Sequence, residues 1–440
     1  MKLAIIGGTG YVGLTTAVCF AFKKHRVYCV GRSKEKIEKL QQGIPPIYEE
    51  KLEEMLKTVL ASKTFVPTLN LEEAVIDSDV SFLCVGTPSR EDGSIDLSQI
   101  IDASKQVGKA LKKKKDYHVV VVKSTVVPGT TEEIVIPILE KESCKKAGKG
   151  FGVCMNPEFL REGQAIKDFM FPKNTGIVIG ELDKKSGNTL YKLYKDFDAE
   201  ILRTSLRAAE MIKYARNSYL AKDISFANEI ANICQRLGID FLEVKKGMEM
   251  DVRIGKGRFL NAGVGFGGSC FPKDVKALIE KAKAVGIKPR ILESSIEVNE
   301  LQPYQAVEML KQHLKELKGK KIAVLGLSFK PGTDDMREAP SIKIVNALIK
   351  EGAEIYAYDP VAMENAKRIF SSSIKYVESA KEALANADAC VIVTDWPEFG
   401  DGKLYRHLRG EILIDGRRIV DPRTIPPRLL YCGIGYPSNK

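Results

Sequence analysis

A short apolar strand, a glycine-rich turn and an apolar helix follow one another at the start of the chain, and no other feature constrains the fold as strongly. The segment LAIIGGTGYVGLTTAVCFAF places the pattern GxGxxG, residues 8–13, directly between the strand and the helix. Glycines at this spacing permit a tight turn, close approach of the backbone to a pyrophosphate, and close packing of helix on strand. The helix N-terminus then faces the phosphates. The pattern therefore predicts a dinucleotide site at Gly8, Gly10, Tyr11, Val12 and Gly13.

The same theme recurs along the chain. The apolar runs HRVYCV, VSFLCVG and HVVVVKST each end in turn residues and alternate with helical segments. Continuous apolar strands that alternate with helices are typical of a parallel sheet covered on both faces. From Lys320 the segment GKKIAVLGLSFKPGTDD again reads as strand and glycine turn, and EIYAYDP resembles a second strand. We therefore predict an α/β fold with two Rossmann-like, doubly wound domains.

A long helix is predicted between these halves. Residues 206–237 contain neither proline nor glycine, and Gly238 is typical of a helix C-cap. A helix of this length usually spans between domains or carries a subunit interface. We therefore divide the chain into an N-terminal dinucleotide-binding domain, a central helical dimerisation domain and a C-terminal Rossmann-like domain, at residues 1–200, 201–300 and 301–440.

Composition narrows the class of protein. Apolar residues make up 44% and charged residues 28%, which is typical of a soluble globular protein. No apolar run approaches the roughly 18–20 residues of a membrane span, and no signal-peptide core precedes the first glycine pair. The expected location is the cytoplasm.

Charge and cysteine usage exclude two further classes. The formal net charge of +11 raises nucleic acid as a partner, but the basic residues are interleaved with acidic ones, as in KEKIEKL and KLEEMLK. A basic surface also attracts a nucleoside diphosphate, so we expect no nucleic-acid partner. The nine cysteines form no CxxC pair and the chain has four histidines, so no metal site is expected.

Cys270 stands apart from the other cysteines. It lies in GFGGSCFPKD, where Pro272 suits the first turn of a helix that continues through Val275 and Leu278. A helix N-terminus and the nearby Lys273 both favour a thiolate. The alternative is a buried loop cysteine. We predict that Cys270 is a nucleophile.

A cysteine nucleophile beside a dinucleotide site has a specific use. One hydride transfer turns an alcohol into an aldehyde, and thiolate addition gives a thiohemiacetal that loses a second hydride to become a thioester. Water then cleaves the thioester. Such an enzyme also needs a base, an oxyanion stabiliser and a carboxylate that activates water.

The residues at the end of the second strand do not decide between NAD and NADP. NAD sites usually place an acidic residue there, which bonds the ribose 2′-hydroxyl. Here the strand ends CVGRSKEK, with Gly31 and Arg32 at that point. Arg32 beside Ser33 and Lys34 could meet the 2′-phosphate of NADP. Alternatively, Arg32 stacks on the adenine and NAD binds.

A set of longer motifs resembles one family over nearly the whole chain. The motifs are GGTGYVGL, PPIYEEKLEE, LCVGTPSREDGSIDLS, VVKSTVVPGTT, MNPEFLREGQAIKDF, EMIKYARNSYLA, DVRIG, FLNAGVGFGGSCFPKD, SFKPGTDDMREAPS and IDGRRIVDP. The chain resembles the UDP-glucose/GDP-mannose dehydrogenase family, and within it the enzymes that oxidise UDP-glucose to UDP-glucuronate. The resemblance implies an NAD cofactor, a homodimer built on the long helix, and UDP-sugar binding by residues 301–440. Position 31 is acidic in the family but is glycine here, so the choice between NAD and NADP stays open.

The resemblance also implies roles for individual residues. Implied for catalysis are Cys270, Lys213, Asn217, Asp274, Glu158 and Thr125. Implied cofactor contacts beyond the glycine motif are Arg32, Lys36, Thr87, Thr125, Glu162, Lys273 and Arg337. Implied substrate contacts are Glu158, Phe159, Leu160, Arg161, Glu162, Lys213, Asn217, Arg253, Phe259, Leu260, Asn261, Gly263, Gly267, Lys330 and Arg417, and Arg253 is implied to reach the neighbouring subunit's site. From its own surroundings in the sequence, Lys213 would be read as part of a solvated helix face.

Two alternatives remain. A GDP-mannose or UDP-N-acetylmannosamine 6-dehydrogenase would share most of these motifs, although GGSCFPKD disfavours the acetylamino-sugar enzymes. A protein that binds nucleotide sugars without catalysis would keep the fold. The joint presence of Cys270, Lys213, Asn217, Asp274 and Glu158 argues against it.

Overall fold

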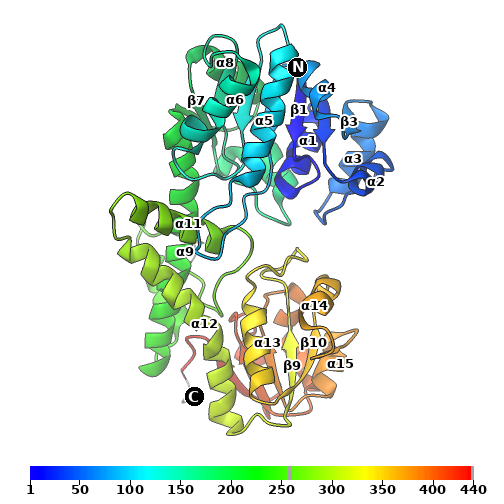
Figure 1. Ribbon diagram of the computed structural model, residues 1–440. Coiled ribbons are helices and arrows are strands. Elements are labelled where there is room, and N and C mark those ends of the chain that lie inside the picture. The colour runs from blue at the N-terminus through cyan, green and yellow to red at the C-terminus, as the bar shows by residue number, and fades with distance from the viewer. Residues whose placement is uncertain (256–259, 438–440) are drawn as a thin grey trace. The chain divides into compact units, whose positions relative to one another are not determined.

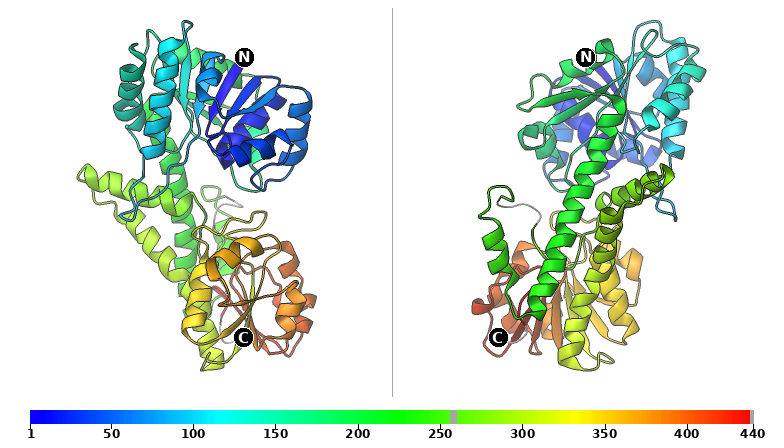
Figure 2. Two further views of the ribbon diagram at one scale, coloured as in Figure 1. Left: turned by 45° about the vertical axis from the view of Figure 1, so that its right-hand side comes forward. Right: turned by 90° about the vertical axis from the view of Figure 1, so that its left-hand side faces the viewer.

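The computed structural model describes residues 1–255 and 260–437. It divides into two compact units, Met1–Arg216 and Asn217–Lys440 (Figure 1). The boundary falls inside the helix α9, Leu206–Arg236, which is one unbroken helix (Figure 2) and agrees with the predicted helix over 206–237. The division into three domains at residues 200 and 300 stays a prediction.

The first unit contains an eight-stranded sheet in the order β3-β2-β1-β4-β5-β6-β7-β8. Its strands are β1 Lys2–Ile6, β2 Arg26–Val30, β3 Phe65–Thr68, β4 Val80–Leu83, β5 Val119–Val122, β6 Gly152–Met155, β7 Ile177–Glu181 and β8 Ile201–Thr204. Its helices are α1 Tyr11–Phe22, α2 Lys34–Gln41, α3 Leu52–Ala61, α4 Leu71–Ile76, α5 Ser98–Lys113, η1 Thr131–Val135, α6 Ile136–Ser143, α7 Ala165–Met170, η2 Pro172–Asn174 and α8 Lys184–Tyr194.

The second unit contains a six-stranded sheet in the order β11-β10-β9-β12-β13-β14, and all of its pairings are parallel. Its strands are β9 Lys321–Leu325, β10 Glu354–Tyr358, β11 Lys375–Tyr376, β12 Ala389–Ile392, β13 Ile412–Asp415 and β14 Leu430–Gly433. Its helices after α9 are α10 Phe241–Met248, α11 Phe271–Ala284, α12 Arg290–Leu314, α13 Pro340–Lys350, α14 Met363–Phe370, α15 Ala380–Ala385 and the short turns η3 Pro397–Gly400, η4 Gly402–His407 and η5 Pro422–Thr424.

Each sheet is covered on both faces. In β1, Leu3 and Ile5 belong to one apolar core and Ala4 and Ile6 to another, because successive side chains of a strand point to opposite faces. β9 divides its residues between two cores in the same way. The predicted α/β class with two Rossmann-like, doubly wound sheets is confirmed.

One strand pair departs from the predicted parallel arrangement. β7 pairs antiparallel with β6, and β8 then runs parallel to β7. A parallel neighbour needs a crossover over a face of the sheet, whereas an antiparallel neighbour can start where the previous strand ends. The segment 156–176 therefore turns back at the carboxyl edge of β6. It carries Glu158 and Glu162, so the reversal keeps both carboxylates at the edge where the glycine-rich turn also lies.

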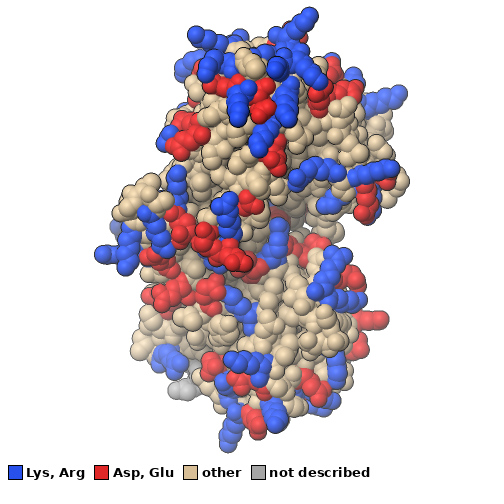
Figure 3. Space-filling view, viewed as in Figure 1, with Lys and Arg blue, Asp and Glu red and all other residues tan. Residues whose placement is uncertain are grey.

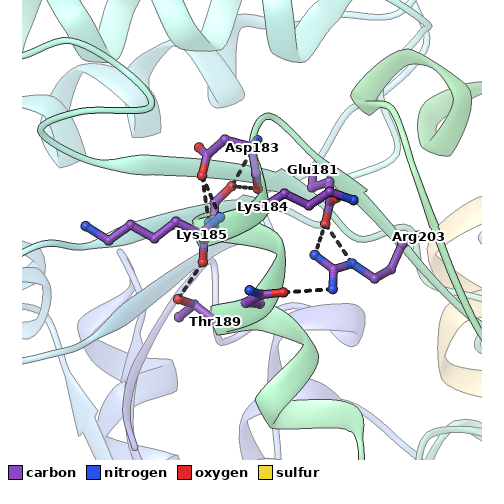
Figure 4. Close-up of polar contacts among 8 residues, drawn as sticks. Glu181, Asp183, Lys184, Lys185, Thr189 and Arg203 are labelled. Carbon is purple, nitrogen blue, oxygen red and sulfur yellow. Dashed lines mark hydrogen bonds and ion pairs between the residues drawn. The ribbon is translucent and has the colours of Figure 1, made fainter.

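Polar contacts hold the last strands of this sheet in place (Figure 4). Glu181, at the end of β7, accepts two hydrogen bonds from the guanidinium of Arg203 in β8, at 2.8 and 2.5 Å. Asp183 caps α8 by accepting from the backbone N–H groups of Lys185 and Ser186. These contacts hold the edge of the sheet from which α9 begins.

Acidic and basic side chains are interspersed on the face drawn in Figure 3. Ion pairs form on helix surfaces, such as Lys39 with Glu35 of α2 at 2.7 Å. None of the helices within residues 1–255 and 260–437 is long and apolar enough to cross a membrane.

Candidate active site

A pocket of about 340 Å³ lies over the glycine-rich turn of the first unit. Gly10 precedes α1 as its N-cap, and Gly13 packs so closely on the turn that a Cβ there would lie 2.3 Å from the Gly7 carbonyl oxygen. Of the predicted cofactor residues, Gly10, Arg32 and Lys36 line this pocket. The site has the turn, the helix N-terminus and the basic side chains that a dinucleotide phosphate needs.

Position 31 forms part of the pocket wall. A Cβ on Gly31 would lie 2.5 Å from the Thr9 Cγ2 atom, so a longer side chain there requires the Thr9 side chain to shift. Arg32 is exposed and donates to the Gln99 side-chain oxygen at 2.9 Å. The pocket therefore presents a guanidinium at the place where an NAD site usually presents a carboxylate.

Two predicted contacts lie at the carboxyl ends of neighbouring strands. Thr87 follows β4 and Thr125 follows β5, and the Thr87 hydroxyl donates to the Thr125 carbonyl at 2.8 Å. Parallel strands end at the same edge, which explains why residues 38 apart in the chain meet. Glu162 lies on the segment after β6, beside Gly163.

Glu158 and Lys213 form a buried ion pair. The Lys213 ammonium lies 2.8 Å from the Glu158 carboxylate, and their exposed fractions are 3% and 6%. Burial alone raises the pKa of Glu158, but the charge and hydrogen bond of Lys213, the Leu160 N–H and the charge of Lys123 together hold that pKa below its usual value. A solvated helix face for Lys213, which its sequence surroundings suggested, is wrong. The chain turns this face of α9 toward the segment after β6.

Lys123 is a second buried lysine close to this pair. Lys123 donates to the Asn156 side-chain oxygen at 2.8 Å, and Asn156 also accepts from the Tyr194 hydroxyl at 2.7 Å. Burial lowers the pKa of Lys123 to about 8. The network fixes the residue at which the segment carrying Glu158 leaves β6.

Neighbouring residues of this segment are also held. Phe159 stacks under the Arg216 guanidinium, whose carbon lies 3.7 Å from the ring centroid, and Leu160 donates its N–H to Glu158 at 2.6 Å. Arg161 pairs with Asp168 through its backbone N–H and its guanidinium, at 2.6–3.0 Å.

Cys270 is the N-cap residue of α11 in the second unit, with Pro272 in the first turn, as the sequence predicted. It is partly exposed, whereas seven of the other eight cysteines are buried and Cys144 is exposed. Burial raises the pKa of Cys84 to about 12 and that of Cys432 to about 11, which keeps those thiols protonated. Position and access therefore distinguish Cys270 as the candidate nucleophile.

Asp274 lies one turn into α11 and is 1% exposed. Its carboxylate accepts from the Asn217 side-chain amide at 2.6 Å and from the Lys273 ammonium at 2.6 Å. Lys273 thus pairs with Asp274. Lys213 and Asn217 are one turn apart on α9, so they share a face of that helix.

The glycine-rich loop before Cys270 is held by polar side chains that the sequence did not single out. Asn228 of α9 accepts from the Gly263 N–H at 2.7 Å, and Gln302 of α12 donates to the Gly263 carbonyl at 2.9 Å. Asn299 of α12 accepts from the Phe266 N–H at 2.7 Å. Amides buried on long helices resemble ordinary polar helix positions in a sequence, so local pattern could not find them.

The C-terminal sheet adds two predicted residues to this loop. Arg417, after β13, donates to the carbonyls of Val393 and Gly265 at 2.7 and 3.1 Å. Burial lowers the pKa of this guanidinium. The Gly268 N–H donates to the Arg337 carbonyl at 2.8 Å, and Gly267 lies against the Glu338 carbonyl.

The other predicted substrate residues are more scattered. Lys330 lies beside the Phe329 ring, and Leu260 is buried. Asn261 is exposed and accepts from Lys245, while Arg253 is 86% exposed and pairs with Asp251. Phe259 lies outside the described residues. Within the described residues, no cluster of histidine, cysteine and carboxylate side chains is arranged to hold a metal ion.

Comparison with known proteins matches the chain in three successive parts. The descriptions are UDP-glucose/GDP-mannose dehydrogenase family NAD binding domain, central domain and UDP binding domain, over residues 1–198, 207–301 and 323–422. A UDP-glucose 6-dehydrogenase of Haloferax volcanii is 44% identical over 96% of this chain and 98% of its own length. A GDP-mannose 6-dehydrogenase of Pseudomonas aeruginosa is 39% identical over 96% of each chain.

Solved structures give the same result. A UDP-glucose dehydrogenase from Pyrobaculum islandicum superposes with a TM-score of 0.92 at 40% identity, covering 99% of this chain and 97% of the other. The match extends over both units and every motif that carried the resemblance. The chain therefore belongs to the UDP-glucose/GDP-mannose dehydrogenase family and is an oxidoreductase with a nicotinamide-cofactor domain.

Proposed function

We propose that the chain is a UDP-glucose 6-dehydrogenase that converts UDP-glucose to UDP-glucuronate. The observation that carries the proposal is the placement of Cys270, a partly exposed thiol at the N-terminus of α11 with the Asn217–Asp274 pair on the same unit. The match of residues 323–422 to a UDP binding domain and the names of the similar proteins support the substrate. Because a GDP-mannose enzyme is also 39% identical, similarity alone does not choose the base and sugar.

The proposed reaction proceeds in two oxidations and one hydrolysis. The C6 alcohol loses a proton and a hydride to give the aldehyde, and the Cys270 thiolate adds to its carbonyl carbon. The thiohemiacetal loses a second hydride to give a thioester, and water cleaves the carbon–sulfur bond to release the acid and the thiol. The nicotinamide cofactor supplies the hydride acceptor, so each acid formed consumes one water and reduces two dinucleotides.

The proposal gives each of the predicted catalytic side chains a role. Lys213 and Asn217 would stabilise the oxyanion of the tetrahedral adducts, because both are donors on one face of α9. Glu158 is ionised at neutral pH, which suits a base that activates the hydrolytic water. Asp274 orients Asn217 through a 2.6 Å hydrogen bond. Thr125, which follows β5, belongs to the proposed catalytic set through the family resemblance.

The substrate is tested by supplying purified protein with UDP-glucose, GDP-mannose and UDP-N-acetylmannosamine in turn, with each dinucleotide. We expect UDP-glucose to give the highest kcat/KM and two reduced dinucleotides for each UDP-glucuronate, measured by absorbance and by chromatography of the acid. A preference for GDP-mannose would reassign the substrate within the family. Binding of nucleotide sugars without any acid product would show that the chain is a binding protein and would contradict the proposed enzyme.

Cofactor choice is a separate prediction. We infer that the site accepts NADP at least comparably with NAD, because Arg32 and Lys36 line the pocket and position 31 has no carboxylate. A charge-assisted contact to the 2′-phosphate contributes about 1.5–3 kcal/mol, which corresponds to roughly ten- to a hundredfold in affinity. Arg32→Ala should therefore lower kcat/KM for NADP by roughly tenfold or more and change that for NAD little. Lys39→Ala, at an exposed lysine of α2 that does not line the pocket, is the control.

The comparison of these variants decides between the two readings of Arg32. A wild type that strongly prefers NAD, with a preference that Arg32→Ala leaves unchanged, would mean that the guanidinium stacks on the adenine. Gly31→Asp is the reciprocal variant and should move the ratio of kcat/KM toward NAD; the Thr9 side chain must shift to admit the new Cβ.

Assembly is the third part of the proposal. α9 exposes Tyr219, Phe226 and Ile233, which recur every seven residues and so form one apolar stripe along the helix. Large apolar stripes on a surface mark protein interfaces, and a second copy of this chain can cover the stripe symmetrically. We propose a homodimer built on α9, in which Arg253 contributes to the site of the partner subunit.

Light scattering should give twice the mass of one chain, and Phe226→Asp should shift the protein toward monomer. Mixing inactive Arg253→Ala chains with inactive Cys270→Ala chains should restore activity, because some dimers then contain one site with both residues. A fully active wild-type monomer would contradict the dimer. Mixed chains that remain inactive would contradict the contribution of Arg253 to the partner's site.

A further inference from the structure

Glu49 is a buried carboxylate that none of the predicted roles includes. It lies in the segment between α2 and α3 and is 6% exposed. One of its oxygens accepts from the Gly163 N–H at 2.8 Å and the other from the Ala165 N–H at 2.7 Å. Glu49 is thus bonded to backbone 114 and 116 residues further along the chain, on either side of the residue after Gly163.

The same carboxylate accepts a short hydrogen bond from the hydroxyl of Tyr11. Tyr11 is the first residue of α1, directly after Gly10 of the cofactor turn. Its hydroxyl oxygen also accepts from the Gly163 N–H at 3.0 Å. Burial, together with the hydrogen bond and charge of Glu49, raises the pKa of Tyr11, so the phenol stays a donor.

These bonds connect two functional segments of the first unit. Gly163 directly follows Glu162, and the segment that contains both begins at Asn156 after β6. At its other end, this segment is held by the Glu158–Lys213 pair at 2.8 Å. Glu49 and Tyr11 hold the second end and place it against the start of α1.

The contacts of Glu49 require two acceptor oxygens on one side chain. The hydrogen bonds that Glu49 accepts come from neutral groups, two backbone N–H groups and one phenol. Burying a charge is costly unless several hydrogen bonds compensate it, and an apolar side chain here would leave the Gly163 N–H, the Ala165 N–H and the Tyr11 hydroxyl without this acceptor. The carboxylate accepts from three donors on two separate segments at once. It therefore fixes the position of one segment relative to the other.

We propose that Glu49 is a positioning residue that couples the glycine-rich turn to the segment carrying Glu158 and Glu162, so that dinucleotide binding and the placement of these carboxylates depend on each other. The assigned roles of Glu158 and Glu162 rest on the proposed function, but the coupling to dinucleotide binding rests only on the first unit. Glu49→Gln should disturb the arrangement, because the NH2 group of the new amide would point at a group that is itself a donor, either a backbone N–H or the Tyr11 hydroxyl. Tyr11→Phe removes one hydroxyl and no charge.

The experiment measures the Kd of the reduced dinucleotide by its fluorescence, without nucleotide sugar, and then kcat and KM in the full reaction. The variants are Glu49→Gln, Tyr11→Phe, the double variant, and Glu50→Gln as a matched control at the adjacent, exposed glutamate. We expect Glu49→Gln to weaken dinucleotide binding roughly tenfold and to lower kcat further. The two single effects should be less than multiplicative in the double variant, because the residues act through one contact. Glu50→Gln should match the wild type.

Each outcome either supports or overturns the coupling. A lower Tm for Glu49→Gln with unchanged Kd, KM and kcat would make Glu49 only structural and would overturn the proposal. If Glu49→Gln does not fold, Tyr11→Phe decides, and a Kd equal to that of the wild type overturns it. Because dinucleotide binding is measured without sugar, failure to oxidise UDP-glucose would count against the proposed function and not against this coupling.

Discussion

Cys270→Ser should lower the production of UDP-glucuronate by at least about 10³-fold, because a serine hydroxyl at neutral pH is a far weaker nucleophile than a thiolate. The fold should be retained, since the substitution exchanges one atom at a partly exposed position. Rapid-mixing absorbance and mass spectrometry would then show at most a slow first oxidation or an ester adduct on residue 270.

Cys144→Ser is the matched control, because Cys144 is exposed and lies at the end of α6. It should leave kcat unchanged. Near-normal turnover in Cys270→Ser, or one reduced dinucleotide for each acid formed by the wild type, would contradict the covalent mechanism.

Lys213→Met should be the second most damaging change, because it leaves Glu158 buried without its cation. Breaking a buried pair in this way typically costs about 3–5 kcal/mol of stability, and loss of an oxyanion donor typically costs about 10²–10³ in kcat. Both effects are measurable, by denaturant unfolding and by steady-state rates. Lys222→Met, a less buried lysine on the same helix that pairs with Asp223, should change both far less.

The pH dependence of this variant has a defined sign. In the wild type the pKa of Glu158 lies below its usual value, so the pair stabilises the fold above the unfolded pKa. That contribution is lost as the pH falls through the folded pKa. Without Lys213, burial dominates and raises the pKa of Glu158, so the acidic limb of the rate profile should move to higher pH. The stability deficit of the variant should shrink toward acid pH, where the carboxyl is protonated.

The double variant Lys213→Met/Glu158→Gln separates stability from catalysis. It should recover much of the lost stability, since the Glu158 carboxylate is no longer buried without Lys213, while kcat stays low. Recovery of kcat as well would show that neither residue acts in the reaction.

Local sequence patterns predicted most of the architecture of each unit. The apolar runs, the glycine turn before α1 and the absence of glycine and proline from residues 206–237 predicted the strands, the cofactor pocket and α9. The position of Cys270 before α11 followed from Pro272 and the apolar spacing after it. These features arise from periodicity and turn chemistry within a few residues, which the sequence displays directly.

The surroundings of the site residues could not be predicted from the sequence. The family resemblance supplied Lys213, Asn217 and Glu158, but not the burial of the Lys213–Glu158 pair. Nothing in the sequence singled out Asn228, Asn299 or Gln302, because an amide that holds a distant loop looks like any polar helix residue.

By itself, the sequence determined two Rossmann-like sheets, the long helix, the glycine turn and the position of Cys270 before α11, because each depends on neighbours along the chain. Only the tertiary structure decided that β7 reverses beside β6, and that Lys213 meets Glu158 across 55 residues. It also decided that Glu49 meets Gly163 across 114 residues. Such contacts depend on strand order and on the path of the connections, and a buried charge becomes favourable only where several distant donors converge on it. That convergence has no local signature in the sequence.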